Sequence, residues 1–183
     1  MHPIKHRNEF PLLFNALKFE GTGAEVGVQA GDFSEVLSDG WLGKLLLIDC
    51  WEHQSKEYND KGNVGQQEQD KLYLSVQKRF EEQKWITVWK RYSLDAAAHV
   101  ADGQLDFVYL DGNHSKDAVA EDLEAWLPKV RLGGIFAGHD YLDAELSFGS
   151  FGVKSAVTEF AARHGFKVYN TLEDWPSWYL INF

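Results

Sequence analysis

Short apolar segments alternate with amphipathic helical patterns along almost the whole chain, and this alternation restricts the possible folds more than any other feature. Residues 45–48 (Leu-Leu-Leu-Ile) and 107–110 (Phe-Val-Tyr-Leu) are unbroken apolar runs that end at Asp49 and Asp111. Runs of this kind are typical of parallel strands that are buried on both faces. Strands that alternate with helices are joined by right-handed crossovers, so the pattern predicts an α/β fold with a mostly parallel sheet.

The alternation predicts seven strands with helices between them. The predicted strands are residues 24–28, 45–48, 86–89, 107–110, 135–137, 166–169 and 178–181. Apolar side chains three or four positions apart mark helices near residues 33–37, 72–80, 115–127 and 153–160, and Ser115 is the expected N-cap of the third. We expect residues 1–183 to form a single domain with an N-terminal helical segment at 1–20. The polar stretch 53–70 lacks apolar periodicity and is expected to be a mobile loop.

The composition argues against several classes of protein. The net charge is −10 and there is no basic run, so no nucleic-acid partner is expected. Cys50 is the only cysteine, which excludes an intrachain disulfide and a cysteine-rich zinc site. The first ten residues are too polar for a signal peptide, and no apolar run approaches the roughly 20 residues of a membrane span. We therefore expect a cytoplasmic protein without a membrane partner, and exposed sheet edges would permit a homodimer.

A glycine-containing turn follows the first predicted strand, where ligands of parallel sheets bind. It reads Glu-x-Gly-x-x-x-Gly, with Glu25, Gly27 and Gly31. A dinucleotide site requires Gly-x-Gly-x-x-Gly, which fails whether counted from Gly21 or from Gly27, and there is no Gly-Lys-Ser/Thr for a P-loop. Asp49 ends the next strand, where a carboxylate can accept both hydroxyls of a ribose. The two features together favour a nucleoside-containing cofactor other than NAD.

Three later segments carry a resemblance to a known family. They are residues 106–114 (Asp-Phe-Val-Tyr-Leu-Asp-Gly-Asn-His), 122–129 (Asp-Leu-Glu-Ala-Trp-Leu-Pro-Lys) and 133–141 (Gly-Gly-Ile-Phe-Ala-Gly-His-Asp-Tyr). With them the chain resembles the class I S-adenosylmethionine-dependent methyltransferases, and most of all the small bacterial group that includes sugar O-methyltransferases of the macrocin and novobiocin type. The resemblance implies a Rossmann-like three-layer sandwich. Its seven-stranded sheet would have the order 3-2-1-4-5-7-6, with strand 7 antiparallel.

The resemblance also implies where the cofactor binds. It assigns cofactor-binding roles to Glu25, Gly27, Gly31, Asp49, Cys50, Trp51, Ser93 and Asp111. The first three would surround the methionine part of S-adenosylmethionine, Asp49 would hold the ribose, and the next three would contact the adenine. Asp111 would lie near the methionine amino group and the transferred methyl.

A metal site is implied as well, although the ligand set departs from the family pattern. Many relatives bind Mg²⁺ through the acid that ends strand four and through an adjacent Asp-Asp or Asp-Asn pair after strand five. Here these positions are Asp111 and the pair His139-Asp140. Mg²⁺ prefers oxygen ligands, whereas an imidazole suits Zn²⁺, Fe²⁺, Mn²⁺ or Ni²⁺ better. Three alternatives stay open: a transition metal held by all three residues, Mg²⁺ held by the two aspartates, or no metal, with His139 in proton transfer.

The general base is also open. The sugar methyltransferases have an aspartate where this chain has Asn113, and an amide cannot take a proton. Catechol-type relatives have a lysine where this chain has His114, whose imidazole titrates near neutral pH. His114 is therefore either the base or a residue of the turn before the next helix. The candidate catalytic residues are His114, Asp111 and His139.

These features lead to one expected function and two alternatives. We expect an S-adenosylmethionine-dependent methyltransferase that acts on a small-molecule acceptor, with oxygen favoured over nitrogen. Residues 53–70 and 141–152 would wall the acceptor pocket, and the first segment would close over the cofactor. One alternative is a non-catalytic S-adenosylmethionine-binding protein, which Asn113 favours. The other is a nucleotide- or NAD-binding oxidoreductase, which the glycine spacing disfavours.

Overall fold

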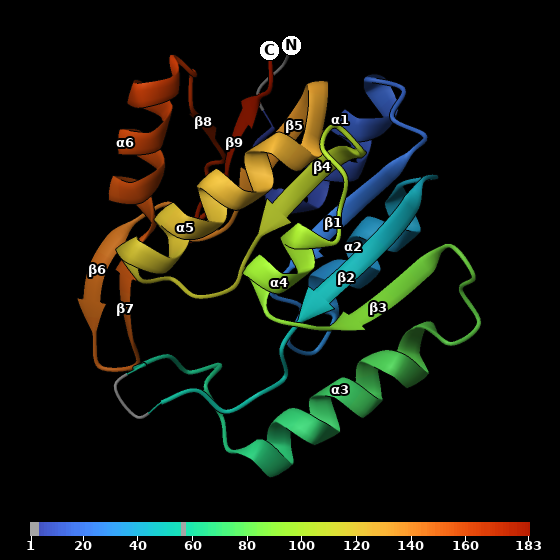
Figure 1. Ribbon diagram of the computed structural model, residues 1–183, viewed down its shortest axis with the longest axis vertical. Coiled ribbons are helices and arrows are strands. Elements are labelled where there is room, and N and C mark those ends of the chain that lie inside the picture. Colours follow the sequence, from blue (N-terminus) through green and yellow to red (C-terminus); the bar gives the residue numbers. More distant parts are fainter. Residues whose placement is uncertain (1–3, 56–57) are drawn as a thin grey trace.

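A central sheet with helices on both faces makes up the core of the protein (Figure 1). The computed structural model describes residues 4–55 and 58–183. In sheet order the strands are β3 (Ile86–Lys90), β2 (Lys44–Asp49), β1 (Thr22–Val26), β4 (Leu105–Leu110), β5 (Val130–Gly138), β9 (Trp178–Ile181) and β8 (Tyr169–Asn170). The first five pair in parallel, and β9 runs antiparallel to both of its neighbours. The predicted order 3-2-1-4-5-7-6 is confirmed, because β9 is the predicted seventh strand and β8 takes the place of the sixth, although it shares only Tyr169 with the predicted residues 166–169.

Two helical layers cover this sheet. One contains α1 (Phe10–Ala16), α2 (Asp32–Gly40) and α3 (Gln66–Phe80), and the other contains α4 (Ser93–Ala98), α5 (Lys116–Trp126) and α6 (Val153–His164). Short 3₁₀ turns occupy Arg7–Glu9 and Leu127–Lys129. Ser115 caps α5 as predicted, because its Oγ accepts from the Ala118 N–H. Among the described residues, no helix combines the length and apolar character needed to cross a membrane.

Strand β4 shows why the central strands read as unbroken apolar runs. Successive side chains of a strand point to opposite faces of the sheet. Phe107 and Tyr109 pack with α1 and α2, whereas Val108 and Leu110 pack with α4, α5 and α6. All four side chains are buried, so neither face of the strand can carry a polar pattern.

Three local predictions differ from the structure. Residues 66–70, which we expected in a loop, form the first turn and a half of α3. This end of α3 faces solvent except at the buried Gln69, so its side chains are polar and show no apolar helical periodicity in the sequence. Helix α4 was not predicted. Residues 141–152, for which no strand was predicted, include a two-stranded hairpin of β6 (Asp143–Leu146) and β7 (Gly149–Gly152).

Candidate functional site

The turn between β1 and α2 packs against the backbone at the end of β4. The φ angle is 92° at Gly27, 51° at Gln29 and 83° at Gly31, all in the left-handed region that glycine adopts most readily. A Cβ on Gly27 would lie 2.0 Å from the backbone oxygen of Asp111. The turn therefore packs directly on the end of β4, and Gly31 begins α2 as its N-cap.

The Asp49 carboxylate braces this turn. Its Oδ2 accepts from the backbone N–H groups of Val28 and Gln29, each at 2.9 Å, and its Oδ1 accepts from that of Trp51 at 2.8 Å. A carboxylate offers about four acceptor positions, so three are taken by the protein itself. Asp49 is half-buried at the end of β2, and its contact with a ribose stays a prediction.

Glu25 lies beneath the turn as a fully buried acid. It is 1% exposed, and the Ser34 Oγ donates to its Oε2 at 2.5 Å. Burial raises the pKa of Glu25 to about 8, even though the Ser34 bond opposes the shift. In the free protein Glu25 is therefore mostly a neutral acid at physiological pH.

This burial makes a prediction about pH. The pKa of Glu25 is 4.5 in the unfolded chain and about 8 in the folded protein. The resulting stability is fully present below pH 4.5, and it is lost as the pH rises from there through 8. Glu25→Gln keeps an acceptor for Ser34 and cannot ionise. We expect its melting temperature to fall less than that of the wild type between about pH 5 and about pH 9, as thermal unfolding in a pH series would measure. Parallel curves for the two proteins would contradict this assignment.

Cys50 and Trp51 follow Asp49, and Trp51 is the more deeply buried of the two. The Trp51 ring is fully buried, its Nε1 donates to the Gln29 backbone oxygen at 2.9 Å, and it packs on Tyr73 with ring centroids 4.9 Å apart. Cys50 is half-buried, and burial raises the pKa of its thiol. Trp51 thus supports the glycine turn from inside the core. Adenine contacts at these two residues stay a prediction.

Ser93 is also engaged within the protein. As the first residue of α4, it donates from Oγ to Asp122 Oδ1 at 2.5 Å and accepts from Trp126 Nε1 at 2.8 Å. These bonds join α4 to α5 behind the strand ends. Its predicted adenine contact is not tested by this arrangement and stays a prediction.

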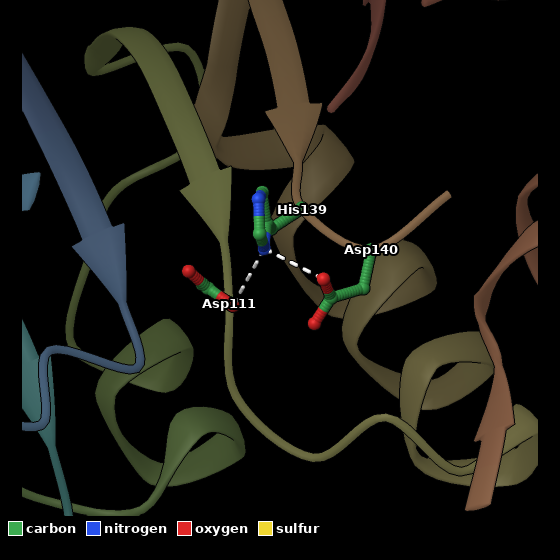
Figure 2. Close-up of side chains that lie close together, drawn as sticks. All are labelled: Asp111, His139 and Asp140. Carbon is green, nitrogen blue, oxygen red and sulfur yellow. Dashed lines mark ion pairs between the residues drawn. The ribbon is translucent and has the colours of Figure 1, made fainter. Parts of the chain in front are cut away.

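A cluster of histidine and aspartate side chains lies beyond the carboxyl ends of β4 and β5. Asp111 follows β4, and His139 and Asp140 follow β5, so parallel pairing of the strands brings them together (Figure 2). The His139 Nδ1 lies 2.7 Å from Asp140 Oδ1 and 3.7 Å from Asp111 Oδ1. One ligand atom from each residue falls within 4.8 Å of the others, so the three could hold a metal ion.

His114 reaches into the same cluster from the loop before α5. Its Nδ1 lies 2.8 Å from Asp60 Oδ2, while its Nε2 lies 3.0 Å from Asp140 Oδ2 and 3.5 Å from Asp111 Oδ1. Burial would lower the pKa of His114, but the three carboxylates raise it to about 11. The general-base role of His114 stays a prediction.

Two residues of the site were missed by the sequence analysis. The Arg7 Nη1 lies 3.4 Å from Asp111 Oδ2, and its guanidinium lies over the Phe33 ring at 4.8 Å. Asp60, within the segment expected to be a loop, pairs with His114 and forms an isolated β-bridge with Gly149. Only the fold brings these residues to the strand ends, and no spacing in the sequence marks them.

Aromatic side chains lie beside the cluster. The Phe151 ring of β7 stacks on His114 with centroids 5.0 Å apart, and Trp175 packs on Phe151 at 5.4 Å and on Phe148 at 6.3 Å. Phe148 is 40% exposed and Trp175 is 36% exposed, so part of this surface is open to solvent. The hairpin and residues near Trp175 therefore form one wall next to the histidine–aspartate cluster.

The order of the strands is that of the class I methyltransferase fold. A family model described as "Methyltransferase domain" matches residues 23–141, well over half of the 183-residue chain. The chain therefore belongs to this family of methyltransferase domains. A search among curated proteins gave no match.

Solved structures share the fold at low sequence identity. A proposed caffeoyl-CoA O-methyltransferase from Staphylococcus aureus has a TM-score of 0.68 and 10% identity, over 98% of this chain and 86% of the other. A proposed O-methyltransferase from Klebsiella pneumoniae has a TM-score of 0.63 and 12% identity, over 97% and 80%. Fibrillarin from Aeropyrum pernix with bound S-adenosylmethionine has a TM-score of 0.60 and 12% identity, over 88% and 67%. These similarities concern the fold, and the macrocin and novobiocin subgroup stays a prediction.

Proposed function

We propose that the protein transfers a methyl group from S-adenosylmethionine to a hydroxyl of a small-molecule acceptor. The observation that carries the proposal is the contact between the Gly27 turn and the end of β4. The glycine turn packs directly on the backbone of Asp111, which also belongs to the Asp111, His139 and Asp140 cluster. Fibrillarin, with its bound S-adenosylmethionine, supplies a structural precedent for the cofactor in this fold. The resemblance of residues 106–141 to sugar O-methyltransferases supports oxygen as the acceptor atom.

Methyl transfer needs orientation more than it needs acid–base chemistry from the protein. The acceptor oxygen bonds to the methyl carbon as the carbon–sulfur bond breaks. The electron pair of that bond stays on sulfur, and S-adenosylhomocysteine is the leaving group. The acceptor hydroxyl proton is released to solvent. In this proposal Asp49 and the backbone of the glycine turn hold the cofactor, and the wall of Phe148 and Trp175 positions the acceptor.

The donor set at the strand ends fits a divalent cation. Asp111 and Asp140 offer oxygen and His139 offers nitrogen. All three lie beyond the carboxyl ends of β4 and β5, as the glycine turn lies beyond that of β1. Asp111, His139 and Asp140 would hold the ion, which would supply the charge that lowers the pKa of an acceptor hydroxyl. Arg7 fixes the outer oxygen of Asp111, so that the other oxygen faces the cluster.

Two measurements on the purified protein test this function. We expect isothermal titration to detect binding of S-adenosylmethionine and S-adenosylhomocysteine but not of NAD. We also expect mass spectrometry to detect S-adenosylhomocysteine once the protein and cofactor are incubated with a fraction of hydroxylated metabolites. Binding of NAD in place of S-adenosylmethionine would overturn the proposal. Binding without turnover on any fraction would instead indicate a non-catalytic cofactor-binding protein, the alternative that Asn113 favours.

A further inference from the structure

We propose that His114 is a fourth metal ligand, that Asp60 positions its ring, and that the resulting site selects a transition metal over Mg²⁺. The inference rests on the proposed function only in placing a cation at Asp111, His139 and Asp140. It makes His114 a metal ligand, whereas the sequence suggested it as a general base. It also assigns a role to Asp60, which lies outside the strand ends.

His114 Nε2 lies close to two of the three residues that could hold a metal ion, Asp111 and Asp140. The His114 Nε2 lies 3.0 Å from Asp140 Oδ2 and 3.5 Å from Asp111 Oδ1, and the His139 Nδ1 lies 2.7 Å and 3.7 Å from oxygens of the same aspartates. Metal–ligand bonds of about 2.1 Å place adjacent donors about 2.9 to 3.4 Å apart in octahedral or tetrahedral geometry. The observed separations bracket this range. The two imidazoles face different oxygens of Asp140, so a movement of side chains would be needed for two imidazoles and two carboxylates to share one ion.

The Nε2 atom of His114 points to the same conclusion. It is fully buried and makes no well-aligned hydrogen bond with the residues described by the structure, although Asp140 Oδ2 lies 3.0 Å away and Asp111 Oδ1 3.5 Å away. Buried polar atoms without a well-aligned hydrogen bond are uncommon in folded proteins, and a bound ion is one reason for them. A metal ion between the two aspartates would satisfy this nitrogen.

Asp60 completes an arrangement that is common around metals. Histidine ligands generally donate their second N–H to a carboxylate, which fixes the tautomer and the ring orientation. Here the His114 Nδ1 lies 2.8 Å from Asp60 Oδ2, leaving Nε2 to face the cluster. The other oxygen, Asp60 Oδ1, accepts from the Gly62 N–H at 2.6 Å, and the Phe151 ring stacks on the imidazole. Asp60 thus holds the edge of the His114 ring, and Phe151 packs on its face.

The chemistry of the donors decides which ion is expected. Mg²⁺ takes oxygen ligands and retains several waters, and two imidazoles would be poor partners for it. Nitrogen and carboxylate donors in equal number suit Zn²⁺, Fe²⁺, Co²⁺ or Mn²⁺ better. The two aspartate ligands would balance the double positive charge of such an ion.

Titrating Co²⁺ into chelator-treated protein tests the inference without an activity assay. We expect visible absorption bands from bound Co²⁺, and isothermal titration should show Zn²⁺ and Co²⁺ binding more than tenfold tighter than Mg²⁺. His114→Gln should weaken Co²⁺ binding by 100-fold or more and change the bands. Asp60→Asn should weaken it about tenfold, as is typical for a carboxylate partner of a metal-bound histidine. His99→Gln, a change at an exposed histidine in the turn after α4, is the matched control and should bind Co²⁺ like the wild type.

The outcomes separate this inference from the proposed function. Equal Co²⁺ affinity in the wild type, His114→Gln and Asp60→Asn would overturn the role of His114, as would tighter binding of Mg²⁺ than of Zn²⁺. Circular dichroism checks that each variant is folded, and Asp60→Asn carries the test if His114→Gln is not. S-adenosylmethionine titration of the same variants reports separately on the cofactor site. Metal binding through His114 without any cofactor binding would support the inference and contradict the proposed function.

Discussion

Gly27→Ala is expected to lower the free energy of unfolding by about 3 kcal/mol or more and to abolish binding of S-adenosylmethionine. The new methyl would lie 2.0 Å from the Asp111 backbone oxygen and 2.6 Å from the Gly112 nitrogen, and both are main-chain atoms that a rotamer change cannot move. The φ of 92° adds strain for any residue with a Cβ. Relief would require β1 and β4 to separate at the end that carries the site. For a chain of this size we expect a melting temperature lower by roughly 10 °C.

Gly65→Ala is the matched control for this change. Gly65 has no atom within 4 Å of an added Cβ, and its φ of −61° suits any residue. As the N-cap of α3 it has a modest preference for glycine, so we expect a loss of about 1 kcal/mol or less and normal cofactor binding. Equal melting temperatures for the two variants would show that the approach of the turn to Asp111 is not constrained.

Asp49→Ala is expected to weaken S-adenosylmethionine binding at least 100-fold and to destabilise the free protein. Its carboxylate accepts three backbone N–H groups, of Val28, Gln29 and Trp51, at 2.8 to 2.9 Å. Hydrogen bonds to a charged group are each worth about 1.5 to 3 kcal/mol when buried, and Asp49 is only half-buried. A total loss of about 2 to 4 kcal/mol is expected from chemical denaturation. Cofactor affinity, measured by isothermal titration, should fall further because the turn loses its shape.

Asp39→Ala provides the comparison, since Asp39 is an exposed acid in the last turn of α2. Removing a negative charge from a helix C-terminus is neutral or slightly stabilising, so both affinity and stability should match the wild type. If Asp49→Ala lost stability but bound S-adenosylmethionine normally, Asp49 would be a structural brace alone and the ribose contact would be wrong.

The main sheet could be predicted because its central strands are buried on both sides. The apolar runs 45–48 in β2 and 107–110 in β4 contain no polar residue other than the buried Tyr109, and each is followed by an aspartate. The elements that were missed have no such requirement. Helix α4 spans Ser93–Ala98, too short for a helical period to repeat, and the strands of the β6–β7 hairpin are four residues long with glycine at both ends of β7.

The site could be predicted only as far as the sheet order determines it. Asp111, His139 and Asp140 follow strands that pair, so parallel pairing was enough to bring them together. Arg7 and Asp60 lie 104 and 54 residues from the partners they contact, on segments without strand or helix periodicity. Their positions depend on how the N-terminal segment and the loop before α3 pack, and that packing is set by tertiary contacts.

The distance along the chain between Arg7, Asp60, Asp111 and Asp140 has a thermodynamic consequence. These groups meet only when the whole sheet is assembled, because the unfolded chain has no means of holding them together. A ligand that needs all of them binds the native state alone, and at 100 times its dissociation constant it stabilises that state by about 2.7 kcal/mol. Occupancy of this one edge of the sheet is thereby linked to the folding equilibrium of the entire molecule, so the heat stability of the protein depends on the concentration of whatever it binds.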